Sequence, residues 1–141
     1  MKKAIFLFFA ALTFLISSAQ QSSSYSVFKS QMGRWNTYLK DWIWDSPTYS
    51  TLTITIYSNT ILVDDKAHSV YTIFKDEGET SGYNKNGNRY KEHSWKCYDE
   101  VNRTVLFSII IYDDVNVCSV MYNDLCYRYY IRKAELSNFN N

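Results

Sequence analysis

The sequence has few of the residues that interrupt chains or build catalytic sites: one proline, four glycines and two histidines among 141 residues. It also has no long apolar run after residue 16 and no long helical stripe. The lack of helical periodicity excludes an all-helical domain. Two histidines provide few bases that could activate a nucleophile and few ligands for a zinc site.

The N-terminus has the three parts of a secretory signal peptide. Lys2 and Lys3 precede an apolar run over residues 4–16, and small residues ending at Ala19 follow. The run is shorter than the ~20 residues that a membrane-spanning helix needs. We therefore expect a signal peptide over residues 1–19, cleaved after Ala19, and a secreted or periplasmic mature chain without a membrane span.

The charge of the mature chain is close to neutral. Without Lys2 and Lys3 it has 13 basic side chains against 14 acidic ones, a formal net charge of −1. Binding to nucleic acid depends on an excess of basic side chains. We therefore expect no nucleic-acid partner, and residues 20–141 are long enough for one domain only.

The mature chain is rich in strand-forming residues, including 13 tyrosines. Residues 51–56 alternate between threonine and an aliphatic side chain, which is typical of a strand with one buried face. Residues 25–32 are the one candidate for a short helical turn. The predicted strands cover residues 34–44, 49–57, 60–63, 67–75, 93–99, 104–112, 117–122 and 125–132, with a polar loop over residues 76–91.

The last three predicted strands fit together as hairpins if residues 113–116 and 123–124 are their turns. One face then holds Phe107, Ile109, Ile111, Cys118, Val120, Tyr122, Leu125, Tyr127, Tyr129 and Ile131. Arg128, Tyr130 and Arg132 lie on the opposite face. The fold class is thus all-β, a single antiparallel meander of about eight strands, and we favour a small barrel over a sandwich.

Gly33, Arg34 and Trp35 open the first of these strands and resemble the Gly-x-Trp signature of lipocalin-like proteins. In that family the tryptophan closes the bottom of an eight-stranded barrel, and an arginine of the last strand stacks on it. The resemblance implies that Arg132, or otherwise Arg128, stacks on Trp35. It also implies a ligand pocket, although the many aromatic side chains could equally fill the interior.

Cys97, Cys118 and Cys126 all lie in the mature chain. Because exported proteins meet an oxidising environment, one disulfide and one free thiol are the simplest expectation. The pairing stays open. The alternative is three buried thiols that act as small hydrophobic side chains.

No set of residues forms a recognisable catalytic or metal motif. His93, Cys97 and Asp99 point the same way from one strand but spread over roughly 20 Å, and His68 lies at a turn. The acidic pairs lie at expected turns, where aspartate makes local hydrogen bonds. We predict no catalytic residue, metal or cofactor.

The sequence therefore predicts an exported, noncatalytic binding or interaction module. Its partner would be a small apolar ligand, a glycan or another protein. An extracytoplasmic inhibitor or immunity-type protein is the alternative, and a small hydrolase is a more remote one. The loop over residues 76–91 is a further candidate for binding because long loops on rigid sheets often hold sites.

Overall fold

The computed structural model describes residues 22–49, 51–64 and 68–132, so the predicted signal peptide lies outside the described residues. The described residues form nine strands and no helix, which confirms the all-β prediction. None of their elements is a helix long and apolar enough to cross a membrane. The strands are β1 (Ser23–Asn36), β2 (Asp41–Trp44), β3 (Leu52–Ile56), β4 (Thr60–Asp64), β5 (Ser69–Tyr83), β6 (Arg89–Tyr98), β7 (Thr104–Tyr112), β8 (Asn116–Met121) and β9 (Leu125–Ile131).

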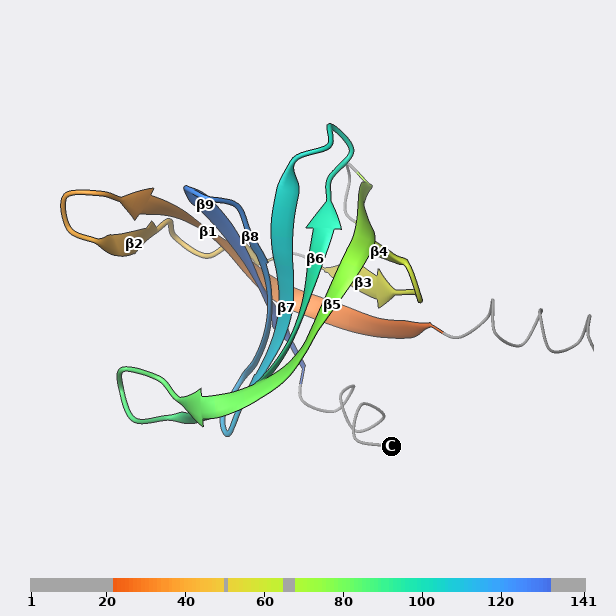
Figure 1. Cartoon of the computed structure of the whole chain (residues 1–141). Helices are drawn as coiled ribbons and strands as arrows, with labels where there is room; N and C mark the ends of the chain where they lie inside the picture. Colours follow the sequence, from red (N-terminus) through yellow and green to blue (C-terminus); the bar gives the residue numbers. More distant parts are fainter. Residues whose placement is uncertain (1–21, 50, 65–67, 133–141) are drawn as a thin grey trace, which may run out of the picture.

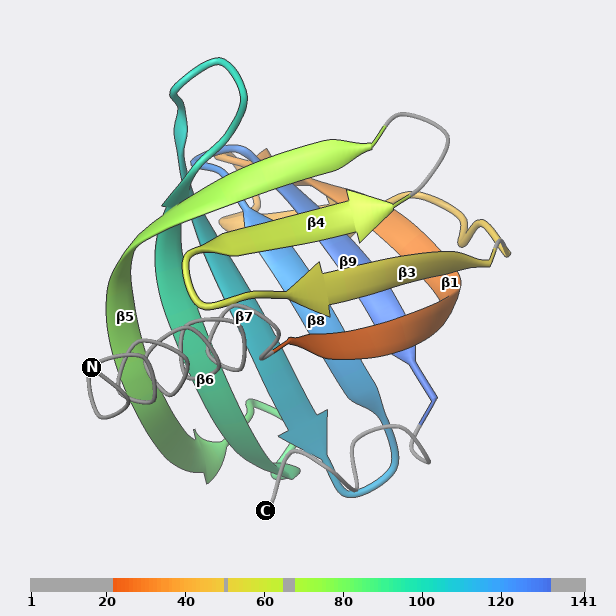
Figure 2. The ribbon, with the colours of Figure 1, turned by 90° about the vertical axis from the view of Figure 1, so that its right-hand side faces the viewer.

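The sheet closes on itself because β1 has two neighbours in the barrel. Its first half pairs with β3, and a longer stretch pairs with β9 on the other edge. Each of the remaining strands pairs with the next one in sequence, always antiparallel. The result is a closed barrel of eight strands with β2 as an extra strand, which confirms the barrel (Figure 2).

The extra strand β2 continues the line of β3 along the same edge of β1. Gly33 pairs with Trp44, Ser30 with Thr48 and Val27 with Leu52, so the chain from β2 to β3 follows β1 with irregularities between the contacts. The predicted strand over residues 34–44 is therefore a hairpin, with β1 and β2 joined by a turn over residues 37–40. This hairpin extends beyond the barrel (Figure 1).

The helical turn predicted over residues 25–32 was wrong, because these residues belong to β1. A β-bulge between Val27 and Lys29 shifts the pairing with β9 by one residue. Val27 therefore faces inward, as does Met32, which pairs with the inward-facing Tyr127. In a regular strand, inward-facing residues are an even number of positions apart. The bulge makes the spacing between Val27 and Met32 odd, and in the sequence this resembles the spacing along one face of a helix.

The polar loop predicted over residues 76–91 was also wrong. It forms the distal halves of β5 and β6, joined by a turn over residues 84–88 (Figure 1). Two irregularities, after Ile73 and after Asp76, interrupt the pairing of β5 with β6, and Gly78 has a φ of 78°. Bulges and charged residues are common on strands whose outer edge meets solvent.

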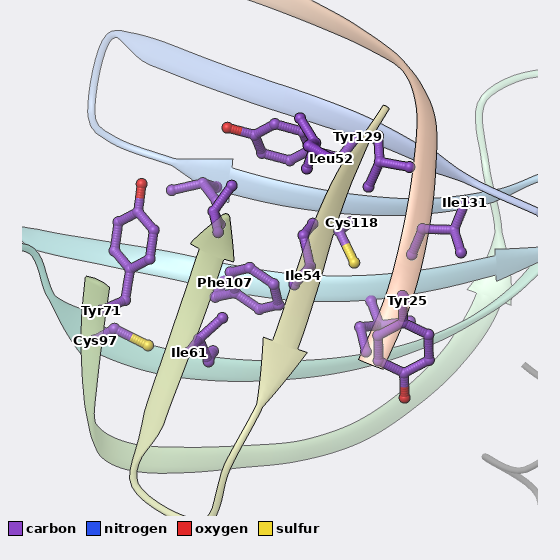
Figure 3. Close-up of a cluster of buried hydrophobic side chains, with 14 of the residues drawn as sticks. Tyr25, Leu52, Ile54, Ile61, Tyr71, Cys97, Phe107, Cys118, Tyr129 and Ile131 are labelled. Atoms are coloured by element: carbon purple, nitrogen blue, oxygen red, sulfur yellow. The ribbon is translucent and has the colours of Figure 1, made fainter. Parts of the chain in front are cut away.

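The barrel interior is filled with side chains. Phe107, Ile54, Ile61 and Ile109 are at most 1% exposed, and Tyr25, Tyr71 and Tyr129 complete the core at its margins (Figure 3). Burial of one such aliphatic or aromatic side chain contributes about 1.5–3 kcal/mol. The inward face predicted for the last three strands is confirmed, and Val120 pairs with Tyr127 as predicted. Phe107 pairs with Val120, two residues from Tyr122, the partner that the predicted four-residue turn would give.

The turns between the last strands are tight. Tyr122 donates its backbone N–H to the carbonyl of Leu125 at 2.7 Å, which closes the predicted two-residue turn. The backbone N–H of Tyr112 donates to the carbonyl of Val115 at 2.9 Å. The preceding hairpin therefore turns through Asp113 and Asp114, two residues where four were predicted.

Candidate binding surface

The outer face of the barrel where β1 meets β9 holds several large polar and aromatic side chains. In β9, Tyr127 and Tyr129 point into the core, so Cys126, Arg128 and Tyr130 point outward. Their partners on β1 are Gly33, Gln31 and Lys29, which share that outer face. The face continues along β1 to Trp35 and across to β2.

Gly33 makes room for an indole on this face. A Cβ atom at residue 33 would lie 2.8 Å from two carbons of the Trp44 ring, closer than real contacts allow. With only a hydrogen at this position, the ring packs directly over the backbone of β1. The guanidinium carbon of Arg128 lies 3.7 Å from the centre of the Trp44 ring, which forms a cation–π contact.

Trp35, Trp42 and Trp44 form a continuous group that we call the indole cluster. The ring centres of Trp35 and Trp42 are 5.4 Å apart at 70°, and those of Trp42 and Trp44 are 6.2 Å apart at 37°. Both arrangements are favourable for aromatic pairs. Because each ring supports the next, the cluster presents a preorganised aromatic surface on the hairpin.

The opposite side and the tip of the β1–β2 hairpin are also apolar and open to solvent. Tyr38 is 92% exposed, Leu39 60% and Ile43 47%. Asn36 holds the turn, since its side-chain oxygen accepts the backbone N–H groups of Tyr38 and Leu39. These hydrogen bonds fix the conformation of the turn, although the apolar side chains of the hairpin are open to solvent.

A second strip of contacts continues the face along β1 and β9. Tyr130 donates its hydroxyl to Oε1 of Gln31 at 2.8 Å, and the ammonium of Lys29 lies 4.1 Å from the centre of the Tyr130 ring. Nε2 of Gln31 donates to the backbone carbonyl of Asp45. These contacts fix the base of the hairpin to the barrel.

The contact predicted between Trp35 and Arg132 was wrong. Along the antiparallel pair, Arg34 lies beside Leu125 and Val27 beside Ile131. Arg132 therefore lies at the opposite end of the ladder from Trp35, roughly 25 Å away. The stacking arginine is Arg128, and its partner is Trp44. Trp35 is 38% exposed on the outer face and does not close the barrel.

The predicted disulfide was also wrong, because Cys97, Cys118 and Cys126 are all free and buried. Cys97 and Cys118 face the core from β6 and β8, which β7 separates, and their β7 partners are four residues apart. Two strand spacings alone exceed about 9 Å, beyond the reach of a disulfide. Cys126 points to the outer face, away from both.

The structure does not bring His93 and Cys97 together. They lie four residues apart on β6, about 13 Å along a strand. His93 instead contacts Asp76, with 2.8 Å between Nε2 and Oδ1, and stacks on Trp95 at 4.1 Å. Burial raises the pKa of Cys97 to about 11, which disfavours the reactive thiolate.

His68 lies at the turn before β5, where its Nδ1 is 2.7 Å from Oδ1 of Asp64. Both side chains are largely exposed. An exposed pair of this kind contributes little to stability. The contact is a surface turn contact, as the sequence predicted for this histidine.

A polar network lies at the barrel end beneath the β6–β7 turn. The buried Asp99 accepts hydrogen bonds from the backbone of Val101 and Arg103, from Nε of Arg103 and from the hydroxyl of Tyr122. Burial opposes ionisation, yet these donors hold the pKa of Asp99 below its usual value. Tyr71 and Tyr122 lie at the same end of the barrel, and burial raises the pKa of both tyrosines.

This network lines a cavity of about 170 Å³ together with Ser69, Val70 and Glu100. Each oxygen of Asp99 already has two donors, so the carboxylate has no capacity left for a ligand. The arrangement closes the turn and this end of the barrel. In the part of the chain that the structure describes, no three His, Cys, Asp or Glu side chains gather as a metal site.

The sequence did not indicate the pairing of Arg128 with Trp44, although one signal was present. Trp42 and Trp44 alternate with Ile43, so both indoles lie on one face of that segment, and Trp35 precedes them by the length of a short hairpin.

Comparison with family models, curated proteins and solved structures finds no match for this chain.

Proposed function

We propose that this protein is an exported, noncatalytic module that binds another protein through its β1–β2 hairpin. The observation that supports this proposal is the indole cluster beside exposed Tyr38, Leu39 and Ile43 on a hairpin outside the barrel. Tryptophan, tyrosine and arginine dominate the energetic centres of protein interfaces. Exposed apolar groups gathered on one element commonly mark such interfaces.

The contents of the barrel favour an outer surface over an internal pocket. A lipocalin-like barrel that holds an apolar ligand needs space at its centre, where Phe107, Ile54 and Ile61 pack here. The strand count is the same as in lipocalins, but Trp35 lies outside the barrel. We therefore assign binding to the hairpin rather than to the interior.

An inhibitor or immunity-type activity is the second candidate, and the shape of the hairpin favours it. A protruding, ordered hairpin with an exposed aromatic tip can enter the cleft of an enzyme or toxin. Asp41 supports the hairpin from the side, because its carboxylate lies 3.5 Å from Nζ of Lys85 at the β5–β6 turn. Such preorganisation lowers the entropic cost of binding.

The test is a comparison of three variants in binding to extracytoplasmic proteins of the producing cell. Partners captured by the wild-type chain are purified and their affinities are measured directly. Trp42→Ala and Ile43→Asp should each weaken binding about 30-fold, the ~2 kcal/mol expected of an energetic centre. Tyr57→Ala is the control, since Tyr57 is 40% exposed and lies after β3.

Circular dichroism of each variant separates loss of the surface from loss of the fold. Equal affinities for wild type, Trp42→Ala and Ile43→Asp would overturn the proposal. So would the absence of any partner that binds the purified chain. A small molecule retained in the barrel and detected by native mass spectrometry would show that the binding site is the barrel interior instead.

A further inference from the structure

A row of five polar side chains crosses the outer face of the barrel at one level. Successive cross-strand partners are Ser94 on β6, Ser108 on β7, Ser119 on β8, Arg128 on β9 and Gln31 on β1. We call these residues the polar row. Their neighbours along each strand point into the core, so the row points outward.

Two of these serines are almost fully buried although they lie on the outside. Ser108 is 1% exposed and Ser119 is 5% exposed. The hydroxyls of Ser94 and Ser108 are 2.9 Å apart, and Ser94 donates to the carboxylate of Glu92 at 3.2 Å. Among the described residues, none hydrogen-bonds the hydroxyl of Ser119. No fully buried side-chain oxygen in that part of the chain lacks a partner, so the Ser119 hydroxyl reaches the surface of the row although most of the residue is covered.

Apolar side chains border the polar row on both sides. Leu106 and Met121 lie one level toward the β8–β9 turn, and Ile110 and Val117 lie one level in the other direction. An open hollow of about 630 Å³ lies on the first side, lined in part by Leu106, Met121 and Lys96. The surface thus combines a narrow polar centre with apolar margins.

Charged and aromatic groups lie at the margins of the row. In the described part of the chain, Arg128 has no carboxylate partner, and its guanidinium rests on Trp44. Burial raises the pKa of Tyr112, while the nearby Arg128 opposes that rise and Glu92 adds to it. The positive charge of Arg128 and the negative charge of Glu92 therefore both lie near the hydroxyl of Tyr112.

We propose that the polar row is a binding site for a neutral oligosaccharide, with Ser119 as a direct hydrogen-bonding residue. A saccharide presents hydroxyls that both donate and accept, together with apolar ring edges. Serine hydroxyls, an amide, a guanidinium and a carboxylate match those hydroxyls. Aliphatic and aromatic margins match the ring edges.

The topology disfavours an added peptide strand at this place. At this level each of the five strands is paired on both edges, so the row offers no free backbone edge to which an extended peptide could add. Four strand spacings make the row about 19 Å long. That length suits a short oligosaccharide that lies across the strands better than a single sugar. The row meets the indole cluster at Arg128, whose guanidinium rests on Trp44, but its three serines lie on β6, β7 and β8, away from the hairpin.

The test measures affinity by isothermal titration calorimetry with five neutral hexasaccharides: cellohexaose, laminarihexaose, maltohexaose, xylohexaose and mannohexaose. Hexagalacturonate is the charged comparison. The variants are Ser119→Val, which replaces the hydroxyl with a methyl group and adds a second methyl on Cβ, and Ser119→Ala, which removes the hydroxyl without adding atoms. Thr72→Val is the matched control, because Thr72 pairs with Tyr98 on the outer face of β5 and is exposed.

We expect one neutral hexasaccharide to bind the wild-type chain and the Thr72→Val variant equally. Its affinity should fall about tenfold in both Ser119 variants, because each removes a direct hydrogen bond. No binding by any neutral probe below about 1 mM would overturn the proposal. Unchanged affinity in the Ser119 variants, or a preference for hexagalacturonate, would overturn it as well. Ile43 lies on the opposite side of β2 from Trp44, and Ile43→Asp should leave this affinity unchanged, so failure of the hairpin proposal can be distinguished from failure of this one.

Discussion

Arg128 lies over the indole of Trp44, and the same indole lies over Gly33, so three strands meet in one stack. The contact joins β9, the last strand of the barrel, to β2, which is outside it. A guanidinium on an indole contributes about 0.5–2 kcal/mol, depending on its burial. The stack therefore couples the hairpin to the closed barrel.

Replacement of Gly33 tests this stack. Gly33→Ala places a methyl group 2.8 Å from the Trp44 ring and should lower the free energy of unfolding by about 1–3 kcal/mol. Urea unfolding followed by tryptophan fluorescence measures the change. Gly82→Ala is the control, since its Cβ would meet the hydroxyl end of Tyr90 at 3.2 Å. Equal stability of the two variants would contradict the proposed packing.

The central aromatic of the core should dominate stability. Phe107 is fully buried, so Phe107→Ala leaves a cavity and should cost about 3–5 kcal/mol. Phe74 is 44% exposed and stacks on Tyr98 at the surface. Thermal unfolding should show a much smaller loss for Phe74→Ala. A comparable loss for both variants would mean that the barrel centre tolerates empty space.

The three cysteines should behave as protected free thiols. Without reductant, iodoacetamide should modify all three in denatured protein, as intact mass would show. In native protein the reaction should be slow at neutral pH, because burial raises the pKa of both Cys97 and Cys126 to about 11. A mass two units lower with only one alkylated thiol would instead demonstrate a disulfide.

Asp99 should contribute to the acid dependence of stability. Its pKa is lowered in the folded chain, so its stabilising effect is complete above the unfolded pKa of about 4. That effect is lost as pH falls through the folded value. Asp99→Asn should therefore lower stability at pH 7 and flatten the decline below pH 4. Urea midpoints measured from pH 2 to pH 7 test this, with the exposed Asp114→Asn as control.

Residues with regular alternation could be predicted well from the sequence. Thr104 and Tyr112 bound β7 as predicted, and the inward set that includes Phe107 and Val120 is confirmed. Both β7 and β8 have regular ladders, so the side-chain period of two holds throughout. The prediction failed where the ladder is irregular, because a bulge changes the phase of the pattern without any signal from the residue type.

The outer surface was harder to predict than the core. The residues after Asp76 resemble a loop because glycine and charge usually mark turns, yet they form an edge strand that tolerates both. Gly33 and Trp35 suggested a barrel floor, but the glycine accommodates Trp44 from another strand. Such a contact depends on which residues of two separate strands are paired, and that pairing cannot be read from the residues next to Gly33 in the sequence.

The pairing of β1 with β9 has a consequence for how the chain folds. The hydrogen bond between Gln31 and Tyr130 joins residues 99 positions apart, so the barrel cannot close until nearly all of its strands exist. Loops of this size are slow to close, and until then β1 presents an open edge to other chains. Conversely, once β9 has docked, each strand of the barrel has a paired neighbour on both sides along at least part of its length, and the molecule should open only as a whole.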